Sequence, residues 1–273
     1  MEACRRHAGA WKFALNEGCL AGSFVKVTRI GLALAPRASV GARTRRCPSP
    51  SLLDTMTTSK FRDRREAGRL LAERLGPLTS QHPVVLGLPR GGVPVAFEVA
   101  RSLASPLDVL VVRKLGVPFQ SELAFGAVGE GGARVLDTQF VQRLGLSTDL
   151  IAQVTQHERA ELDRRVGLYR GGRTALGLNG RTVVIVDDGL ATGASALVAV
   201  EVARARGAER VIVAVPVSSR EALERLRAEA DEVVSLLVPA HFMAVGEWYE
   251  DFSQTTDHEV TSLLDESSQQ DGP

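Results

Sequence analysis

Two neighbouring carboxylates, Asp187 and Asp188, stand where an apolar run ends and a loop of small residues begins. The run Val183-Val184-Ile185-Val186 has the composition of a strand that is buried on both faces of a parallel sheet. The loop leads into a predicted helix over 194–206, and the free N–H groups and positive dipole end of a helix start favour a phosphate. The expected phosphate contacts are Gly189, Ala191, Thr192, Gly193, Ala194 and Ser195.

The acid pair restricts what else the ligand carries. Two carboxylates repel a bare anion, so the ligand must also bring donors or a cation, such as vicinal hydroxyls or Mg²⁺. Phosphate, diol and metal together describe a ribose 5-phosphate. The alternative is an ordinary strand–turn–helix whose acids cap the helix. A Walker A loop is excluded because the stretch has no Gly-x-x-x-x-Gly-Lys pattern.

A second glycine-rich turn, Leu88-Pro89-Arg90-Gly91-Gly92, follows a predicted strand over 84–88 and precedes a predicted helix over 93–103. A further strand is predicted over 107–112, which makes a βαβ unit and favours a parallel sheet. Arg113 and Lys114 follow that strand, and we expect them at the carboxyl end of a central strand, where α/β proteins bind ligands.

These segments resemble the type I phosphoribosyltransferases, which bind phosphoribosyl pyrophosphate (PRPP). The resemblance covers about residues 61–260 and includes a bacterial group with the segments that stand here at 87–92, 112–114 and 244–249. It implies that Asp187 and Asp188 hold the ribose hydroxyls and that residues 189–195 hold the 5-phosphate. It also implies a pyrophosphate site at Arg90, Gly91, Gly92, Arg113 and Lys114, with a cis peptide expected between Arg90 and Gly91. Mg²⁺ would be held mainly by substrate oxygens, with Asp187 and Asp188 as further ligands.

The implied reaction is transfer of the phosphoribosyl group to a nitrogenous base with release of pyrophosphate. Family members that use 6-oxopurines carry an acid immediately before the Thr-Gly turn, and this chain has Ala191 there. We therefore expect an acceptor other than hypoxanthine or guanine, with Glu122 and Glu130 as conceivable proton-transfer groups. The alternative function is a non-catalytic regulator that binds PRPP. A hydrolase that uses Ser195 is disfavoured because no His partner is evident.

The fold class predicted from this order of elements is α/β, with a doubly wound, mostly parallel sheet. The expected organisation is a basic, disordered extension over 1–55, a phosphoribosyltransferase core over 56–238, and a small hood and tail over 239–273. The aromatic residues Phe242, Trp248 and Tyr249 either contact the base or fasten the tail to the core. The extension is either a targeting arm or an over-extended reading frame that precedes a true start at Met56.

Two further stretches carry open alternatives. Residues 115–132 contain a predicted strand and a glycine-rich piece that is either the hinge of a mobile loop or a hairpin turn. A long helix is predicted over 147–169 with Ser147 as its cap. The arginines that end it (Arg164, Arg165 and Arg170) form either a solvated face or a phosphate site, which could be shared across a homodimer.

Composition narrows the class of protein. A net charge of +1 gives no nucleic-acid or membrane signature. The three cysteines all lie within the first 47 residues, which suits a reducing compartment and argues against a disulfide framework. No apolar run approaches the roughly 20 residues of a membrane helix. The expected location is cytoplasmic, and the expected partners are PRPP and a base.

Overall fold

The computed structural model describes residues 60–118 and 120–270. The predictions made for residues 1–55 therefore lie outside the described residues. No helix in the described part of the chain is long and apolar enough to cross a membrane.

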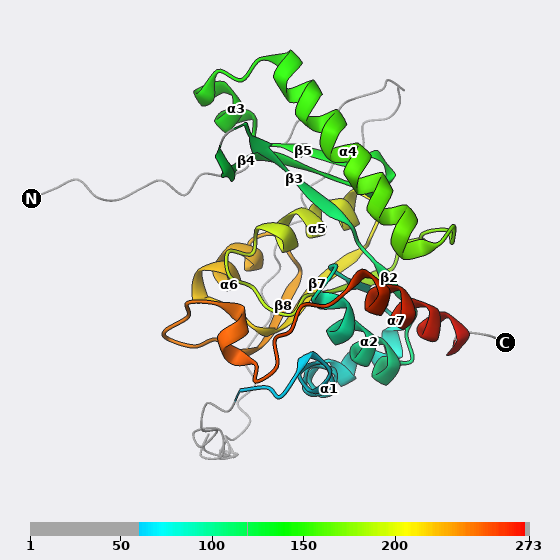
Figure 1. Cartoon of the computed structure of the whole chain (residues 1–273). Coiled ribbons are helices and arrows are strands. Elements are labelled where there is room, and N and C mark those ends of the chain that lie inside the picture. Colours follow the sequence, from blue (N-terminus) through cyan, green and yellow to red (C-terminus); the bar gives the residue numbers. More distant parts are fainter. Residues whose placement is uncertain (1–59, 119, 271–273) are drawn as a thin grey trace, which may run out of the picture. The chain divides into compact units, whose positions relative to one another are not determined.

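The main sheet has five parallel strands in the order β2-β1-β6-β7-β8, which confirms the predicted doubly wound sheet (Figure 1). Its strands are β1 Val84–Gly87, β2 Leu107–Val109, β6 Thr182–Val186, β7 Arg210–Val217 and β8 Glu232–Leu237. The chain runs outward from β1 to β2, returns to β6 on the other side of β1, and continues to β8. The order therefore reverses between β1 and β6.

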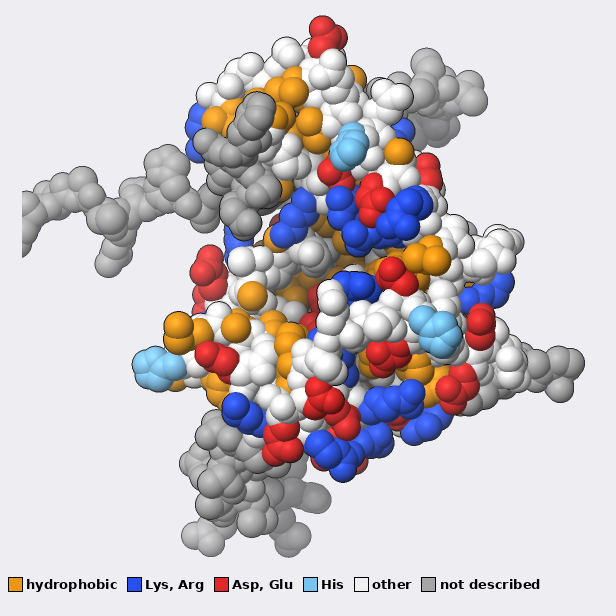
Figure 2. All heavy atoms as spheres, in the orientation of Figure 1, with side chains coloured by type: hydrophobic (Ala, Val, Ile, Leu, Met, Phe, Trp, Pro, Cys, Tyr) orange, Lys and Arg blue, Asp and Glu red, His pale blue; other side chains and the backbone are white. Residues whose placement is uncertain are grey.

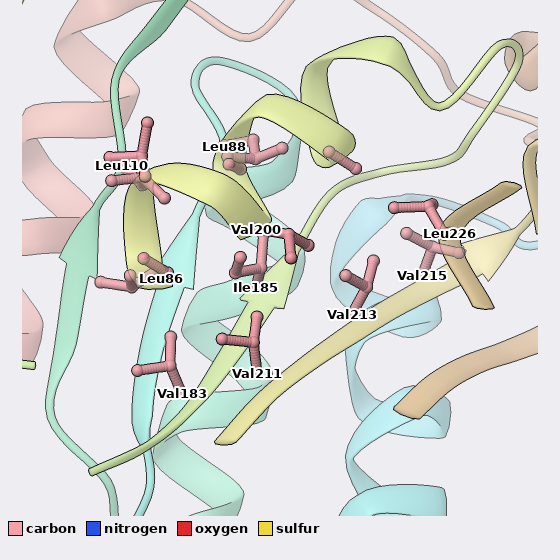
Figure 3. Packing of buried hydrophobic residues seen from close by; sticks show 14 of the residues in the cluster. Leu86, Leu88, Leu110, Val183, Ile185, Val200, Val211, Val213, Val215 and Leu226 are labelled. Atoms are coloured by element: carbon pink, nitrogen blue, oxygen red, sulfur yellow. The ribbon is translucent and has the colours of Figure 1, made fainter. Parts of the chain in front are cut away.

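Helices cover both faces of this sheet, as alternation of side chains along buried parallel strands requires. The flanking helices are α1 Arg64–Leu75, α2 Gly92–Leu103, α5 Ala194–Ala205 and α6 Arg220–Arg227, with a short 3₁₀ helix, η1 Gly76–Gln81, after α1. Val183 and Ile185 pack in one cluster with residues of α5 and α6, as Figure 3 shows. Val184 and Val186 point the other way, into a cluster with α1 and α2.

A second, antiparallel sheet corrects the prediction of one strand over 107–112. The chain leaves β2 after Val109 and enters a sheet of order β3-β4-β5, covered by α4. These elements are β3 Val112–Val117, β4 Gln120–Gly129, η2 Glu130–Gly132, β5 Arg134–Leu136, α3 Thr138–Leu144 and α4 Thr148–Arg170. Because Val128 pairs with Arg134 across the glycine-rich piece, that piece is a hairpin turn. The predicted helix over 147–169 is confirmed, and Ser147 accepts from the Leu150 N–H as its cap.

A buried ion network ties the two sheets together. Arg170, at the end of α4, donates to Asp108 of β2 over 3.0 Å and to Glu130 over 2.5 Å. Glu130 also accepts from the Val111 N–H over 2.8 Å, at the point where the chain passes between the sheets. All three charged side chains are buried. Both alternatives for Arg170, a solvated face and a phosphate site, are therefore wrong, because its guanidinium is buried and paired with Asp108 and Glu130. Glu130 is likewise too enclosed to serve as the conceivable proton-transfer group.

The C-terminal segment divides into two parts. Its first part contains a 3₁₀ helix, η3 Val245–Trp248, near the ends of β7 and β8. Its second part, α7 Asp257–Gln270, packs against α2 and α4 through Val260, Leu263 and Leu264. The first part lies near the predicted ligand site, since a Cβ atom at Gly189 would lie 2.5 Å from Val245 Cγ1, and the apolar face of α7 covers the core.

Candidate functional site

The two predicted ligand loops lie side by side at the carboxyl edge of the main sheet. They follow β1 and β6, the two strands between which the strand order reverses. The Leu88 N–H donates to the Val186 carbonyl oxygen over 2.9 Å and so ties the loop after β1 to the end of β6. In open parallel sheets, ligands bind outside the strand ends at such a reversal. The fold thus brings together the two segments that the sequence singled out.

Gly91 and Gly92 are the positions at which the first loop touches the acid pair. A Cβ atom at Gly91 would overlap Asp188 Oδ2, and one at Gly92 would lie 2.8 Å from the Asp187 Cα atom. Gly91 has φ −63° and ψ −29°, which any residue adopts. Glycine is therefore required here for space and not for an unusual backbone conformation.

The non-proline cis peptide of this loop joins Pro89 to Arg90. The predicted position, between Arg90 and Gly91, is wrong by one bond. Gly91 already has helical dihedral angles, and the Gly92 N–H donates to the Leu88 carbonyl oxygen over 3.0 Å. The helical turn thus begins too early for the irregular bond to lie after Arg90.

The second loop presents backbone donors. Within the described chain, no acceptor receives the N–H groups of Ala191, Thr192, Gly193 or Ser195. Gly193 has φ +73°, a left-handed conformation that favours glycine, and α5 begins at the next residue. Free N–H groups at the start of a helix are the donors that a phosphate accepts from.

The strand after α5 holds this loop in place. The Leu190 N–H donates to the Val217 carbonyl oxygen over 2.9 Å, and Ser219 Oγ donates to the Ala191 carbonyl oxygen over 2.6 Å. A Cβ atom at Gly189 would lie 2.5 Å from Val245 Cγ1, so the segment that contains η3 closes over the start of the loop. Contacts within the protein thus hold the loop in this conformation.

The acid pair is partly buried, and burial raises the pKa of both carboxyls. The nearby charge of Asp188 raises the pKa of Asp187 further. Arg64 opposes the shift of the Asp188 pKa, since its Nε donates to Asp188 Oδ2 over 2.9 Å. The Asp188 N–H donates to Asp187 Oδ1 over 2.9 Å. The pair is therefore held by one cation and one backbone bond.

Arg64 was missed by the sequence analysis, which named no site residue before Arg90. The contact with Asp188 joins residues 124 positions apart, so no local pattern could reveal it. One signal was available. A cation at the first position of a helix opposes the helix dipole and so suggests a role outside the helix.

The predicted basic residues after β2 lie elsewhere than expected. β2 is an edge strand of the main sheet, and Arg113 and Lys114 lie in β3 of the second sheet. Arg113 pairs with Glu158 of α4 at 2.7 Å, and Lys114 is exposed. The prediction of two cations at the end of a central strand is wrong, because the chain leaves the main sheet two residues before Val112. Figure 2 shows Lys and Arg side chains gathered beside a hollow between α4 and the main sheet.

The three predicted base contacts share one cluster. Phe242 and Trp248 are partly buried and Tyr249 is 3% exposed, and all three pack with Phe61 and neighbouring apolar residues. The Tyr249 hydroxyl donates to the Asp188 carbonyl oxygen over 2.6 Å. Burial raises the pKa of this phenol, so it stays a donor. Because its ring is enclosed, Tyr249 supports the acid pair and offers no face to a base.

The free oxygens of the acid pair suit a hard cation. Asp187 Oδ2 and Asp188 Oδ1 accept no hydrogen bond from the described residues. No group of three or more His, Cys, Asp or Glu residues able to hold a metal ion exists in the described chain. Two carboxylate oxygens fit Mg²⁺ that takes its remaining ligands from substrate and water, as Mg²⁺ commonly does at phosphate sites.

Comparison with known proteins agrees with this arrangement. The family described as "Phosphoribosyl transferase domain" matches residues 63–251. Two proteins of Mycobacterium tuberculosis strains, each named "Putative phosphoribosyl transferase", are 56% identical over 205 residues; this covers 75% of the chain but only 46% of their own length. The crystal structure of a Thermus thermophilus protein, TT1426, is 51% identical with a TM-score of 0.70, over 76% of this chain and 98% of that one. The chain belongs to the phosphoribosyl transferase domain family.

Proposed function

We propose that the chain is a phosphoribosyltransferase that transfers the phosphoribosyl group of PRPP to a nitrogenous base and releases pyrophosphate. The observation that carries this proposal is the meeting of three features at the strand reversal. These are the acid pair, the free N–H groups of the loop over 189–195, and the glycine loop pressed against the acids. Each complements one part of PRPP: the ribose hydroxyls, the 5-phosphate and the diphosphate.

The proposed chemistry assigns the protein the tasks of positioning and electrostatic stabilisation. Asp187 and Asp188 accept hydrogen bonds from the ribose hydroxyls and so fix the sugar. The N–H groups of Thr192 and Gly193 hold the 5-phosphate at the other end. The C1–O bond to the diphosphate then breaks as a ring nitrogen of the base forms the new bond to C1. When bound, Mg²⁺ neutralises charge on the leaving diphosphate.

The acceptor is proposed to be a base other than hypoxanthine or guanine. Ala191 stands immediately before the Thr-Gly turn, and its methyl group cannot exchange a proton with a purine nitrogen. Glu130, one of the two acids considered as a substitute, is buried in the ion network of Arg170. The side chain of Glu122, the other acid, lies outside the described part of the structure, so Glu122 stays a candidate for this proton transfer.

The test is pyrophosphate release from PRPP and Mg²⁺ across a panel of purine, pyrimidine and pyridine bases, with Asp188→Asn as the control of weakened PRPP binding. We expect release with at least one base and not with hypoxanthine or guanine. Comparable turnover of either of those two would contradict the acceptor assignment. Tight PRPP binding without release from any base would favour a regulator, which a titration against RNA and DNA would then examine.

A further inference from the structure

Arg64 has no role in the site as described so far beyond its bond to Asp188, yet it is fixed from three sides. Its Nε donates to Asp188 Oδ2 over 2.9 Å, and its Nη1 donates to the Ser253 carbonyl oxygen over 2.8 Å. Its guanidinium carbon lies 4.0 Å from the centre of the Phe252 ring and 5.9 Å from that of Tyr249. The side chain is only 11% exposed. These contacts hold the guanidinium in one position.

The Arg64 guanidinium has N–H donors that are not used by these hydrogen bonds. An arginine carries five N–H donors, and the two hydrogen bonds above use two of them. The remaining three meet no acceptor in the described chain. A largely enclosed guanidinium with free donors is suited to an anion with several oxygens, because its planar fork matches phosphate geometry.

The position of Arg64 points to one part of the ligand. A Cβ atom built on Gly91 would lie 3.2 Å from Arg64 Nε, so the guanidinium borders the glycine loop after β1. The resemblance implied that Arg90, Arg113 and Lys114 supply the positive charge at that loop. Arg113 is instead paired with Glu158, and Lys114 lies exposed in the second sheet. Of the three, Arg90 belongs to the loop itself and is partly buried. Arg64, with a side chain that is 11% exposed, is a further cation beside the loop.

We propose that Arg64 binds the diphosphate of the substrate while it keeps its bond to Asp188. This inference rests on the proposed function and adds a residue from α1, outside the loops that the sequence identified. The contact with the Phe252 ring fits this role, because an aromatic face holds a guanidinium in one plane. In this arrangement Arg64 links the carboxylate that fixes the ribose to the group that leaves.

The experiment measures binding of two ligand fragments to the full chain by calorimetry with Mg²⁺ present. The fragments are inorganic pyrophosphate and ribose 5-phosphate. The variants are Arg64→Gln and Arg64→Lys, and the control is Arg62→Gln, which removes a guanidinium that is 62% exposed and pairs only with Asp63 among the described residues. Thermal unfolding of each variant reports whether the fold is kept.

We expect Arg64→Gln to weaken pyrophosphate binding about ten- to hundredfold, the usual effect of losing hydrogen bonds to a charged group. Ribose 5-phosphate binding should change much less. Arg64→Lys should recover part of the loss, because an ammonium group keeps the charge but not the fork. Arg62→Gln should bind both fragments as the unaltered protein does.

Two results would overturn the inference. Pyrophosphate binding that is unchanged in Arg64→Gln would show that the guanidinium makes no such contact. Equal weakening of both fragments would show that Arg64 acts only through Asp188. If Arg64→Gln does not fold, the same two comparisons are made with Arg64→Lys. If neither fragment binds to the unaltered protein, the proposed function itself is refuted.

Discussion

Replacing Gly91 with alanine tests whether the loop after β1 and the acid pair form one site. Gly91 has ordinary helical dihedral angles, so the added methyl group causes no backbone strain. It would, however, overlap Asp188 Oδ2, and ordinary contact begins only at 3.4 Å. The loop or the carboxylate must then move by more than about 1 Å. Overpacking of this kind costs about 1–3 kcal/mol of stability.

The effect on the ligand should exceed the effect on stability. A displacement of about 1 Å in a positioned group can cost about a hundredfold in rate, and we expect a loss of about ten- to hundredfold in PRPP affinity. The assay is calorimetric titration of PRPP with Mg²⁺, together with denaturant unfolding. Gly76→Ala is the matched control, because nothing lies within 4 Å of its Cβ position and its φ is −45°. Unchanged PRPP affinity in Gly91→Ala would refute the view that the glycine is there to let the loop meet Asp188.

Two further substitutions test the surroundings of the site. Tyr249→Phe removes the hydroxyl that donates to the Asp188 carbonyl oxygen, and it should lower the free energy of unfolding by about 1–2 kcal/mol; equal stability by denaturant unfolding would contradict this support role. Glu201→Gln should stabilise the protein at pH 8 by about 1–2 kcal/mol and have no such effect near pH 4. Burial, with the charge of Glu229, raises the pKa of Glu201 to about 7, so the folded state binds a proton that the unfolded state has lost, and stability falls as pH rises through that window. Parallel stability curves for Glu201→Gln and the unaltered protein from about pH 4 to 8 would disprove this.

Local patterns were sufficient to predict the centre of the main sheet and its parallel direction, but not the end of β2. The apolar run before Asp187 predicted β6 because strands covered on both faces read as continuous apolar residues. The glycine turns after β1 and β6 predicted the loops because close backbone approach leaves few other residues possible. Ser147 predicted the start of α4, because a helix cap is a hydrogen bond between residues close in the sequence.

The break between the two sheets and the role of Arg64 depend on tertiary interactions, which local sequence patterns do not reveal. The break between β2 and β3 depends on the buried bonds among Asp108, Glu130 and Arg170, whose partners lie 40 and 62 positions apart. From the sequence, Arg170 was interpreted as part of a solvated face or as a phosphate site, and Glu130 as a conceivable proton-transfer group. The role of Arg64 depends equally on a distant partner. Buried ion pairs have no periodic signature, so sequence patterns leave them unassigned.

The central claim is that the acid pair and its two loops form a PRPP site, and titration of PRPP into the protein with Mg²⁺ tests it most directly. The account predicts saturable binding of one PRPP per chain. It also predicts that Asp188→Asn, which loses a charge-assisted hydrogen bond, weakens binding about ten- to hundredfold, and that Asp187→Asn acts similarly. Binding that is absent from the unaltered protein, or equal in all three proteins, would contradict the account.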